Sequence, residues 1–356
     1  MTDILPELKR ADQRIIPVDH SEIRLFTVVR DEELRLPNFL THYRQLGVQR
    51  FFVINNKSRD NTRDYVLAQP DCHLFDTNAS FLTSQSGVKW LNSLLGVYGT
   101  GHWIVYADAD ELLVYPHYEH HKLPELCDWM DQHGYQGIYS LMLDMYSDQS
   151  LGQISYAKGG SLLAACPWLD RHYVFVPRLS LSFGKRPFPE FEPIGGPRLR
   201  LCYPNQNTNR LWPRLQAKLR YRYNKLAHRL CWPQLPGERP ATQAFKLPLI
   251  KWQQDYGYIT SHRLNPVALA PVTGAVLHFK YLQDFTTKVQ HALQTKEHYD
   301  CSSEYAIYAQ LLADNPSLTF MYEGSQFYRD SQQLVDLCLI KDDADWVSYA
   351  RAQADA

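Results

Sequence analysis

Apolar runs alternate with helix-type patterns along roughly the first 110 residues of the chain. Each apolar run is short enough for a strand, and each segment between two runs carries apolar residues at helical spacing. The predicted elements are strands at 22–29, 48–54, 73–75 and 103–106 and helices at 34–46, 63–68 and 87–98. Strands that alternate with helices in this way predict an α/β fold with a mainly parallel, helix-flanked sheet.

The rest of the chain has a less regular pattern. Many glycines and prolines between residues 159 and 207 predict loops and short strands. Further elements are expected as strands at 138–145, 247–252 and 275–279 and as helices at 285–313 and from 331 onward. We therefore expect a mixed, mainly parallel sheet with an irregular C-terminal half. The expected division is a polar leader (1–20), one α/β domain (21–290) and a C-terminal helical region (291–356).

The predicted strand at 103–106 ends in three acids, Asp108, Asp110 and Glu111, after which apolar sequence resumes. Burying an unpaired carboxylate is costly, so acids at the end of a buried strand need a partner. Two acids at positions i and i+2 of an extended segment point to the same side. At the carboxyl end of a strand in an open α/β sheet, that side faces the ligand crevice. The pattern favours a divalent metal site of the Mg²⁺ or Mn²⁺ type, and the alternative is a loop that happens to be acidic.

Composition narrows the class of protein only a little. A net charge of −1 over 356 residues argues against a dedicated nucleic-acid binder. Aromatic residues reach 13%, which suits stacking on sugars but also fills cores. The seven cysteines are scattered without a CxxC motif, which predicts reduced, buried thiols in a cytoplasmic protein. No signal peptide is visible at the N-terminus, and no run of about 18 apolar residues is present to span a membrane.

One segment, residues 205–237, is strongly basic. It contains no acid and seven basic residues, which are Arg210, Arg214, Lys218, Arg220, Arg222, Lys225 and Arg229. Leucines recur near helical spacing within it, and Trp212 and Trp232 lie beside them. This is the pattern of a basic amphipathic helix that lies on an anionic membrane surface. The alternative, a helix docked on the more acidic remainder of the same protein, stays open because any surface helix is amphipathic.

Several motifs occur together in a recognisable order. They are Thr27-Val-Val-Arg30-Asp-Glu32, the stretch 36–48, Asn55-Asn-Lys-Ser58-Arg-Asp60-Asn-Thr62, Asp108-Ala-Asp110-Glu111, Gly195-Gly-Pro-Arg198-Leu-Arg200 and Leu277-His278-Phe-Lys280. Together they resemble family 2-type glycosyltransferases, and most of all a bacterial subgroup whose metal motif reads DxDE before an apolar run. The resemblance covers residues 22–290 and rests on the order and spacing of the motifs.

The resemblance implies a GT-A, Rossmann-like fold and transfer of a sugar from a nucleotide-sugar donor to a hydroxyl of a glycan or glycolipid acceptor. The setting it implies is the synthesis of a bacterial surface polysaccharide or lipopolysaccharide, in the cytoplasm or at the inner face of the cytoplasmic membrane. It also implies Mn²⁺ or Mg²⁺ held by Asp108 and Asp110, with His278 completing the metal shell. Such an ion acts as a Lewis acid on the leaving diphosphate.

Further residue roles follow from the same resemblance. The donor would be bound by Val29, Arg30, Glu32, Asn55, Lys89, Trp90, Asp108, Arg198, Arg200 and Lys280. Asn55 departs from the family pattern, which usually has an Asp there, and Lys89 and Trp90 could instead be a solvated lysine and a core tryptophan. The general base of an inverting transferase would be Asp144, Glu190 or Glu192. Ser58, Asp60 and Thr62 are expected to serve as turn and cap residues.

Three other classes fit parts of the pattern. A phosphatase of the haloacid dehalogenase type also has Asp-x-Asp after an apolar strand, although near its N-terminus. A catalytically inactive glycan-binding protein would not need Asp108, Asp110 and His278, all of which are present. A sugar nucleotidyltransferase of related fold normally has a Gly-rich N-terminal loop, and residues 20–35 contain no glycine.

Overall fold

The computed structural model describes residues 4–151, 153–178, 188–208, 210–237, 240–241, 243–297 and 299–354. The strands are β1 (Lys9–Arg10), β2 (Arg24–Val29), β3 (Arg50–Asn56), β4 (Cys72–Thr77), β5 (Trp103–Tyr106), β6 (Glu111–Val114), β7 (Gly137–Asp144), β8 (Trp168–Asp170), β9 (Tyr173–Pro177), β10 (Phe191–Gly195), β11 (Phe245–Lys246), β12 (Leu249–Lys251), β13 (Tyr258–Thr260), β14 (Arg263–Leu264), β15 (Leu269–His278) and β16 (Ser325–Phe327). The helices are α1 (Leu36–Gln45), α2 (Thr62–Leu67), α3 (Val88–Tyr98), α4 (Leu123–His133), α5 (Leu162–Ala165), α6 (Pro197–Cys202), the 3₁₀ turn η1 (Pro204–Gln206), α7 (Leu211–Arg229), α8 (Phe285–Thr295), α9 (Tyr299–Asp314), α10 (Ser331–Asp336) and α11 (Ala344–Ala354).

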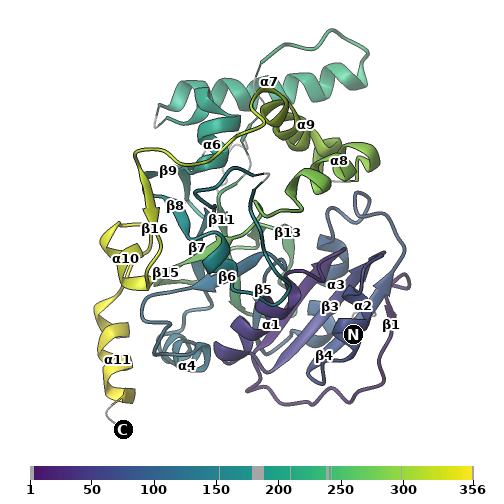
Figure 1. The fold of residues 1–356 in the computed structure, drawn as a ribbon. Coiled ribbons are helices and arrows are strands. Elements are labelled where there is room, and N and C mark those ends of the chain that lie inside the picture. The colour runs from purple at the N-terminus through teal and green to yellow at the C-terminus, as the bar shows by residue number, and fades with distance from the viewer. Residues whose placement is uncertain are drawn as a thin grey trace.

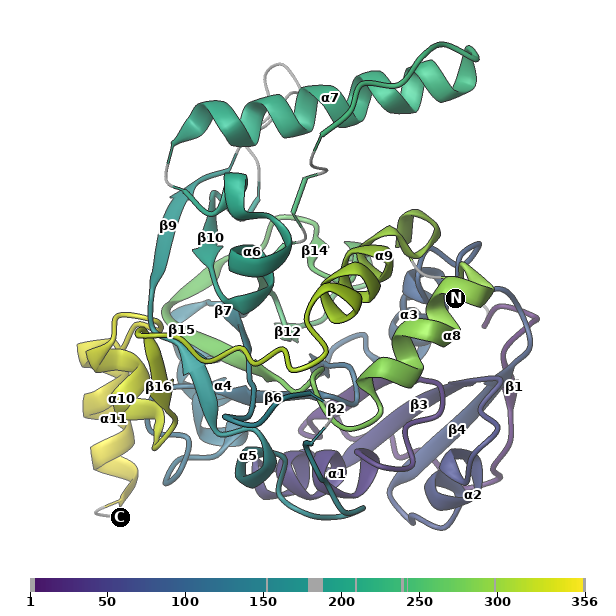
Figure 2. The ribbon, with the colours of Figure 1, turned by 45° about the horizontal axis from the view of Figure 1, so that its top comes forward.

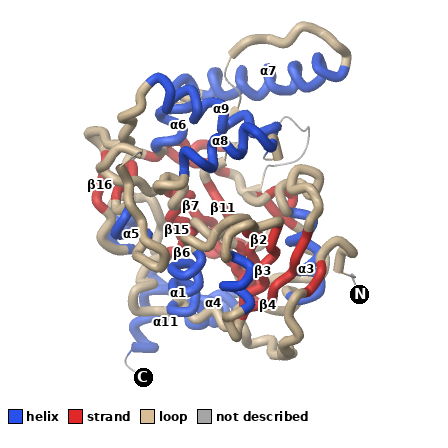
Figure 3. Tube along the Cα trace, turned by 45° about the vertical axis from the view of Figure 1, so that its right-hand side comes forward, coloured by secondary structure: helices blue, strands red, loops and turns tan. Residues whose placement is uncertain are grey.

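A ten-stranded sheet runs through the centre of the molecule (Figure 1) in the order β1-β4-β3-β2-β5-β12-β7-β15-β6, and β11 pairs with β7 beside this path. The strands β4, β3, β2, β5, β7 and β15 run in one direction, and β1, β12, β11 and β6 run in the other. Helices flank the sheet, as the tube view in Figure 3 shows. The predicted α/β class with a mixed, mainly parallel sheet is therefore confirmed.

Alternate residues of the strands pack into two separate cores. In β2, Leu25 and Val29 join one buried cluster with α1 and α4, whereas Phe26 joins a second cluster with α3. Side chains of a strand point to opposite faces in turn, so each face of the sheet is covered by its own helices. A sheet buried on both faces leaves its strand ends as the place where polar groups can gather.

The strands that run in the same direction end at one edge of the sheet, and the helices α6, α8 and α9 contact that edge. Ion pairs join Arg35 to Asp284 at the start of α8, and Asp144 at the end of β7 to Arg198 of α6. The same arginine lies 4.0 Å from Glu304 of α9. In Figure 2, α7 lies farther out than these helices, at the periphery of the molecule. The sheet edge is thus covered by the C-terminal half of the chain.

Some sequence expectations differ from the structure. The single helix expected at 285–313 is wrong, because the chain turns between α8 and α9 at Lys296, whose φ of 52° is left-handed. The leader contributes to the fold, since β1 pairs with β4. Among the described thiols, Cys231 and Cys338 are exposed, contrary to the expectation of buried cysteines. The division of the chain at residues 20 and 290 stays a prediction.

None of the helices that the structure describes is both long enough and apolar enough to cross a bilayer.

Candidate active site

Asp110 and His278 meet at the carboxyl edge of the sheet, although they are far apart in the sequence. Strand β15 pairs with β6, with His278 opposite Glu111, and the Phe279 N–H donates to the Asp110 carbonyl at 2.7 Å. This pairing brings the His278 Nε2 to 3.4 Å from Asp110 Oδ2. Two chemically complementary side chains are therefore held together by strand register, and not by a flexible loop.

Asp144 holds the other nitrogen of the same imidazole. In the parallel pair β7–β15, Asp144 lies opposite His278, and its Oδ1 is 2.6 Å from His278 Nδ1. Burial alone would lower the pKa of His278, but the carboxylates of Asp110 and Asp144 outweigh it and raise this pKa to about 9. Burial likewise raises the pKa of Asp144, but Arg198 and His278 bring it down to about 2. The three side chains form a row of ion pairs, Asp144–His278–Asp110, which is called the relay below.

The spacing within this relay can be compared with that of two ligands of one metal ion. Two ligand atoms at right angles around an ion, each about 2.1 Å from it, are about 3 Å apart. The 3.4 Å between Asp110 and His278 is close to that spacing. A carboxylate on the far nitrogen of a metal-binding histidine fixes its ring and tautomer, as Asp144 does here. The spacing of Asp110 and His278 therefore fits two ligand positions of a divalent ion.

The expected third ligand, Asp108, is placed elsewhere. Its Oδ2 lies 3.2 Å from the ammonium of Lys246. Within the described ranges, no group of three or more His, Cys, Asp and Glu side chains is arranged to hold an ion. The structure thus brings together two of the three expected ligands, Asp110 and His278, and points Asp108 toward a lysine.

Lys246 is the residue of this site that the sequence analysis missed. It is 1% exposed, pairs with both Glu111 and Asp108, and lies 4.5 Å from the centre of the Tyr106 ring. Burial would lower the pKa of Lys246, but the two carboxylates raise it above its usual value. Glu111, also 1% exposed, accepts a further hydrogen bond from the Asp108 N–H at 2.8 Å. Glu111 is therefore the acid that fixes the turn carrying Asp108 and Asp110.

A second network fixes the loop after β2. Arg35 is fully buried and donates to both carboxylate oxygens of Asp284, at 2.7 Å each. Glu32 pairs with Arg35 at 3.3 Å and with Lys288 of α8 at 2.6 Å. Arg30 pairs with Glu297 at 2.5 Å. Glu32 and Arg30, both expected to bind the donor, therefore tie the β2 loop to the α8 region.

The other residues expected near the nucleotide lie in different surroundings. Val29 is buried at the end of β2. Asn55 donates to Asp76 Oδ1 at 2.8 Å, which places a carboxylate at the end of β4 that the sequence analysis missed. Trp90 of α3 is fully buried in the core between that helix and the sheet, so it offers no exposed face for stacking. Lys89 is exposed and donates to the Thr83 carbonyl at 3.1 Å.

The segment after β3 is a scaffold for the β2 loop. Ser58, Thr62 and Asp60 accept hydrogen bonds from the backbone N–H groups of residues 31, 32 and 33, at 3.0, 2.8 and 3.0 Å. Thr62 is completely buried. These bonds join two loops that are far apart in the sequence, which the expectation of local turn and cap chemistry did not include. Asp60 also makes a local turn bond, since its Oδ1 accepts from the Thr62 N–H at 3.0 Å, but the expected cap is wrong, because α2 has no side-chain N-cap.

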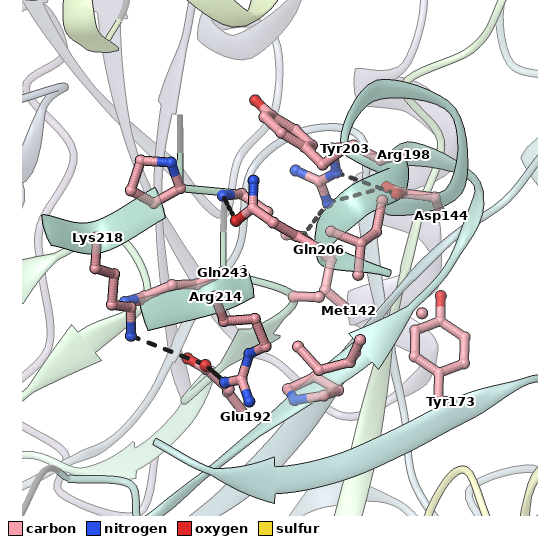
Figure 4. A pocket seen from close by; sticks show the side chains of 17 residues that line it. Met142, Asp144, Tyr173, Glu192, Arg198, Tyr203, Gln206, Arg214, Lys218 and Gln243 are labelled. Atoms are coloured by element: carbon pink, nitrogen blue, oxygen red, sulfur yellow. Dashed lines mark hydrogen bonds and ion pairs between the residues drawn. The ribbon is translucent and has the colours of Figure 1, made fainter. Parts of the chain in front are cut away.

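A pocket adjoins the relay on its Asp144 side (Figure 4). It has a cavity volume of about 60 Å³, and its lining includes Asp144, Arg198, Glu192, Arg214 and Lys218. Glu192 pairs with Arg214, and Lys218 lies 3.9 Å from the same carboxylate. Asp144 and Glu192, two of the three expected bases, therefore line one pocket.

The remaining expected residues lie outside that lining. Glu190 is exposed and lies two residues before Glu192. Arg200 pairs with Asp170 at 3.1 Å and its guanidinium carbon lies 4.1 Å from the centre of the Tyr322 ring. Lys280 pairs with Glu304 at 3.2 Å. Arg200 and Lys280 thus have partners within the protein at this edge.

Comparisons with known proteins give only distant similarity. No family model matches the sequence, and no curated protein matches it either. One similar structure is a protein described as a glucose-1-phosphate thymidylyltransferase from Bacillus anthracis, in complex with sucrose (8% identity, TM-score 0.25, 39% of this chain and 65% of that one). A second is glucosyl-3-phosphoglycerate synthase from Mycobacterium tuberculosis, in complex with Mn²⁺, UDP and glucosyl-3-phosphoglycerate (17% identity, TM-score 0.21, 36% of this chain and 44% of that one).

A third similar structure is a UTP-bound UGPase from Acinetobacter baumannii, with 7% identity, a TM-score of 0.28 and 93% of both chains covered. The matches to the first two structures span less than two thirds of those proteins' own lengths. Similarity at this level does not assign a function to this protein.

Proposed function

We propose that this protein is a metal-dependent glycosyltransferase of the GT-A type, which moves a sugar from a nucleotide-sugar donor to a hydroxyl of a glycan or glycolipid. The observation that carries the proposal is the relay Asp144–His278–Asp110, built at the carboxyl edge of an α/β sheet and beside a pocket. Ligands of open α/β sheets bind at that edge. The motif resemblance described above supports the same reaction class.

Asp110 and His278 would hold Mn²⁺ or Mg²⁺ against the donor diphosphate. The bound ion would supply charge stabilisation for the leaving nucleoside diphosphate. Asp110 is well suited to hold a cation. Burial raises its pKa, but His278, Arg35 and Lys288 lower it far more, so the carboxylate stays ionised. Asp144 keeps the imidazole oriented with Nε2 toward Asp110.

The pocket beside Asp144 is the proposed site for the acceptor. In-line attack requires the acceptor hydroxyl to lose its proton to a general base. We propose Glu192 or Asp144 for that role, because both line the pocket; each is held in ion pairs, Glu192 with Arg214 and Asp144 with Arg198 and His278. The acceptor class that the motif resemblance favours is a bacterial surface polysaccharide or lipopolysaccharide.

Thermal unfolding with and without Mn²⁺ and a panel of nucleoside diphosphates tests the proposal. A ligand that binds only the native state at 100 times its Kd stabilises it by about 2.7 kcal/mol. We expect at least one nucleoside diphosphate to raise Tm by several degrees with Mn²⁺ present, and much less without it. The same ligand pair should leave Tm unchanged in Asp110→Asn.

Two results would count against the proposal. One is the absence of any metal-dependent shift across uridine, guanosine, cytidine and thymidine diphosphates. The other is release of inorganic phosphate from sugar phosphates without an acceptor, which would favour a phosphatase.

A further inference from the structure

We propose that α7 and the segment that follows it, residues 210–237, form a docking surface for an anionic lipid membrane. The inference concerns a different side of α7 from Arg214 and Lys218, which line the pocket, and it does not depend on the reaction proposed above. It rests on an exposed apolar stripe, on the way the helix is attached to the body, and on the charges beside the stripe.

The stripe consists of five exposed residues on one side of α7 and its C-terminal end: Trp212, Leu219, Tyr223, Leu226 and Leu230. Their exposed fractions run from 37% to 62%. With 3.6 residues per turn, these positions fall within an arc of about 60°. Isolated exposed apolar residues are ordinary, but five of them along one side of a 19-residue helix mark an interaction surface.

The helix is attached to the body through other positions. Ala217 is buried, and the buried guanidinium of Arg214 pairs with Glu192 of β10. The apolar stripe is therefore not the face that packs against the rest of the protein. This observation argues against the alternative in which the apolar face of the helix packs against the more acidic remainder of the same protein.

The segment after α7 extends the apolar surface. It folds back along the helix, as Figure 2 shows, and Asn224 fixes it through two hydrogen bonds to the backbone of Leu235, at 2.9 and 2.8 Å. Trp232 and Leu235 remain 53% and 49% exposed. Tryptophan is enriched at the boundary between the lipid headgroups and the acyl chains, so two exposed tryptophans in one surface favour a membrane interface.

The charges beside the stripe select an anionic surface. Arg222, Lys225 and Arg229 are exposed, and none of the acidic side chains that the structure describes pairs with them. The sequence from 205 to 237 contains no acid. A helix with an apolar face and a basic flank lies in the interface of an anionic bilayer. A second copy of this chain fits less well, because pairing the stripes would bring like charges together.

Co-sedimentation of the protein with vesicles tests the proposal. We expect strong binding to vesicles with 30% phosphatidylglycerol in phosphatidylcholine, and at least tenfold weaker binding to pure phosphatidylcholine. The variant Arg222→Glu/Lys225→Glu/Arg229→Glu should bind the anionic vesicles at least 100-fold more weakly. The variant Leu219→Ser/Leu226→Ser should lose at least tenfold, because it removes apolar area without changing charge.

A matched control carries the same charge reversals on another exposed surface: Arg329→Glu/Lys341→Glu/Arg351→Glu. It should bind within threefold of the unmodified protein, and circular dichroism should show that all variants are folded. Equal loss in the control and in the α7 variant would overturn the proposal. Failure of the unmodified protein to bind anionic vesicles would also overturn the proposal. If size-exclusion chromatography then finds a dimer that Leu219→Ser/Leu226→Ser dissociates, the surface binds a second copy of this chain and not a membrane.

Discussion

Asp110→Asn and His278→Gln are each expected to lower the rate of metal-dependent sugar transfer by about 100-fold or more. Each removes one of two ligands that would hold the ion against the diphosphate, and the Lewis-acid contribution of such an ion is several kcal/mol. Because each 1.36 kcal/mol of barrier is a factor of ten, a loss of about 3 kcal/mol gives this effect. The measurement is the initial rate of nucleoside diphosphate release from the nucleotide sugar that gives the largest Mn²⁺-dependent turnover.

The control for this prediction is Asp64→Asn on the protein surface. The Asp64 side chain is 76% exposed and lies 3.8 Å from Arg63, so its loss should leave the rate within twofold. Both site variants should also require more Mn²⁺ for half-maximal rate, if any rate remains. An Asp110→Asn variant with the unmodified rate and the unmodified Mn²⁺ requirement would exclude Asp110 as a ligand.

Lys246→Met is expected to lower the free energy of unfolding by about 3–5 kcal/mol, the largest stability effect that we expect from a single substitution at the site. The substitution leaves the carboxylate of Glu111 buried at 1% exposure without its cation. Methionine has a similar length, so the loss reflects the unpaired charge more than a cavity. The measurement is urea-induced unfolding followed by tryptophan fluorescence at pH 7.

Lys251→Met is the matched control. Lys251 pairs with Asp131 at 3.0 Å, but their side chains are 27% and 43% exposed, so the loss should be within about 1 kcal/mol. The double variant Lys246→Met/Glu111→Gln removes both charges and should regain part of the stability. If Lys246→Met is no more destabilising than Lys251→Met, the buried pair does not fix the turn that carries Asp108 and Asp110.

Local patterns along the sequence predict several strands of the sheet and the polar residues at their carboxyl ends. The apolar runs that became β2, β3, β5, β7 and β15 were each visible as predicted strands, and the polar residues at their ends were singled out. Among these, Asp110 and His278, both expected as metal ligands, lie 3.4 Å apart, and their role as ligands stays a prediction. Strand periodicity and parallel topology are enough to place such residues at one edge.

Partners distant in the sequence could not be predicted in the same way. Lys246 and Glu111 are 135 positions apart, and no local pattern connects them. A lysine inside the apolar run that starts at Phe245 was the one available signal, because a buried lysine needs a carboxylate. Likewise, the expected ligand role of Asp108 came from its spacing to Asp110, whereas its orientation depends on the long-range contact with Lys246.

The docking surface and the pocket share one helix. Arg214 and Lys218 of α7 line the pocket, and the apolar stripe lies on a different side of the same helix. If the function proposed above holds, a membrane-bound α7 would keep the pocket close to the lipid surface. That geometry would suit a glycolipid acceptor better than a soluble sugar. Comparing the rates of sugar transfer to acceptors with and without a lipid tail would distinguish these two acceptor classes.

Electron paramagnetic resonance of Mn²⁺ bound together with a nucleoside diphosphate tests the central claim most directly. We predict a ¹⁴N coupling from the His278 imidazole and ³¹P couplings from the diphosphate on the same ion. His278→Gln should lose the nitrogen coupling, whereas His262→Gln, which changes a partly buried histidine bonded to the Phe245 carbonyl, should keep it. The absence of a nitrogen coupling in the unmodified protein would contradict a metal site at Asp110 and His278. A nitrogen coupling that persists in His278→Gln would contradict it as well.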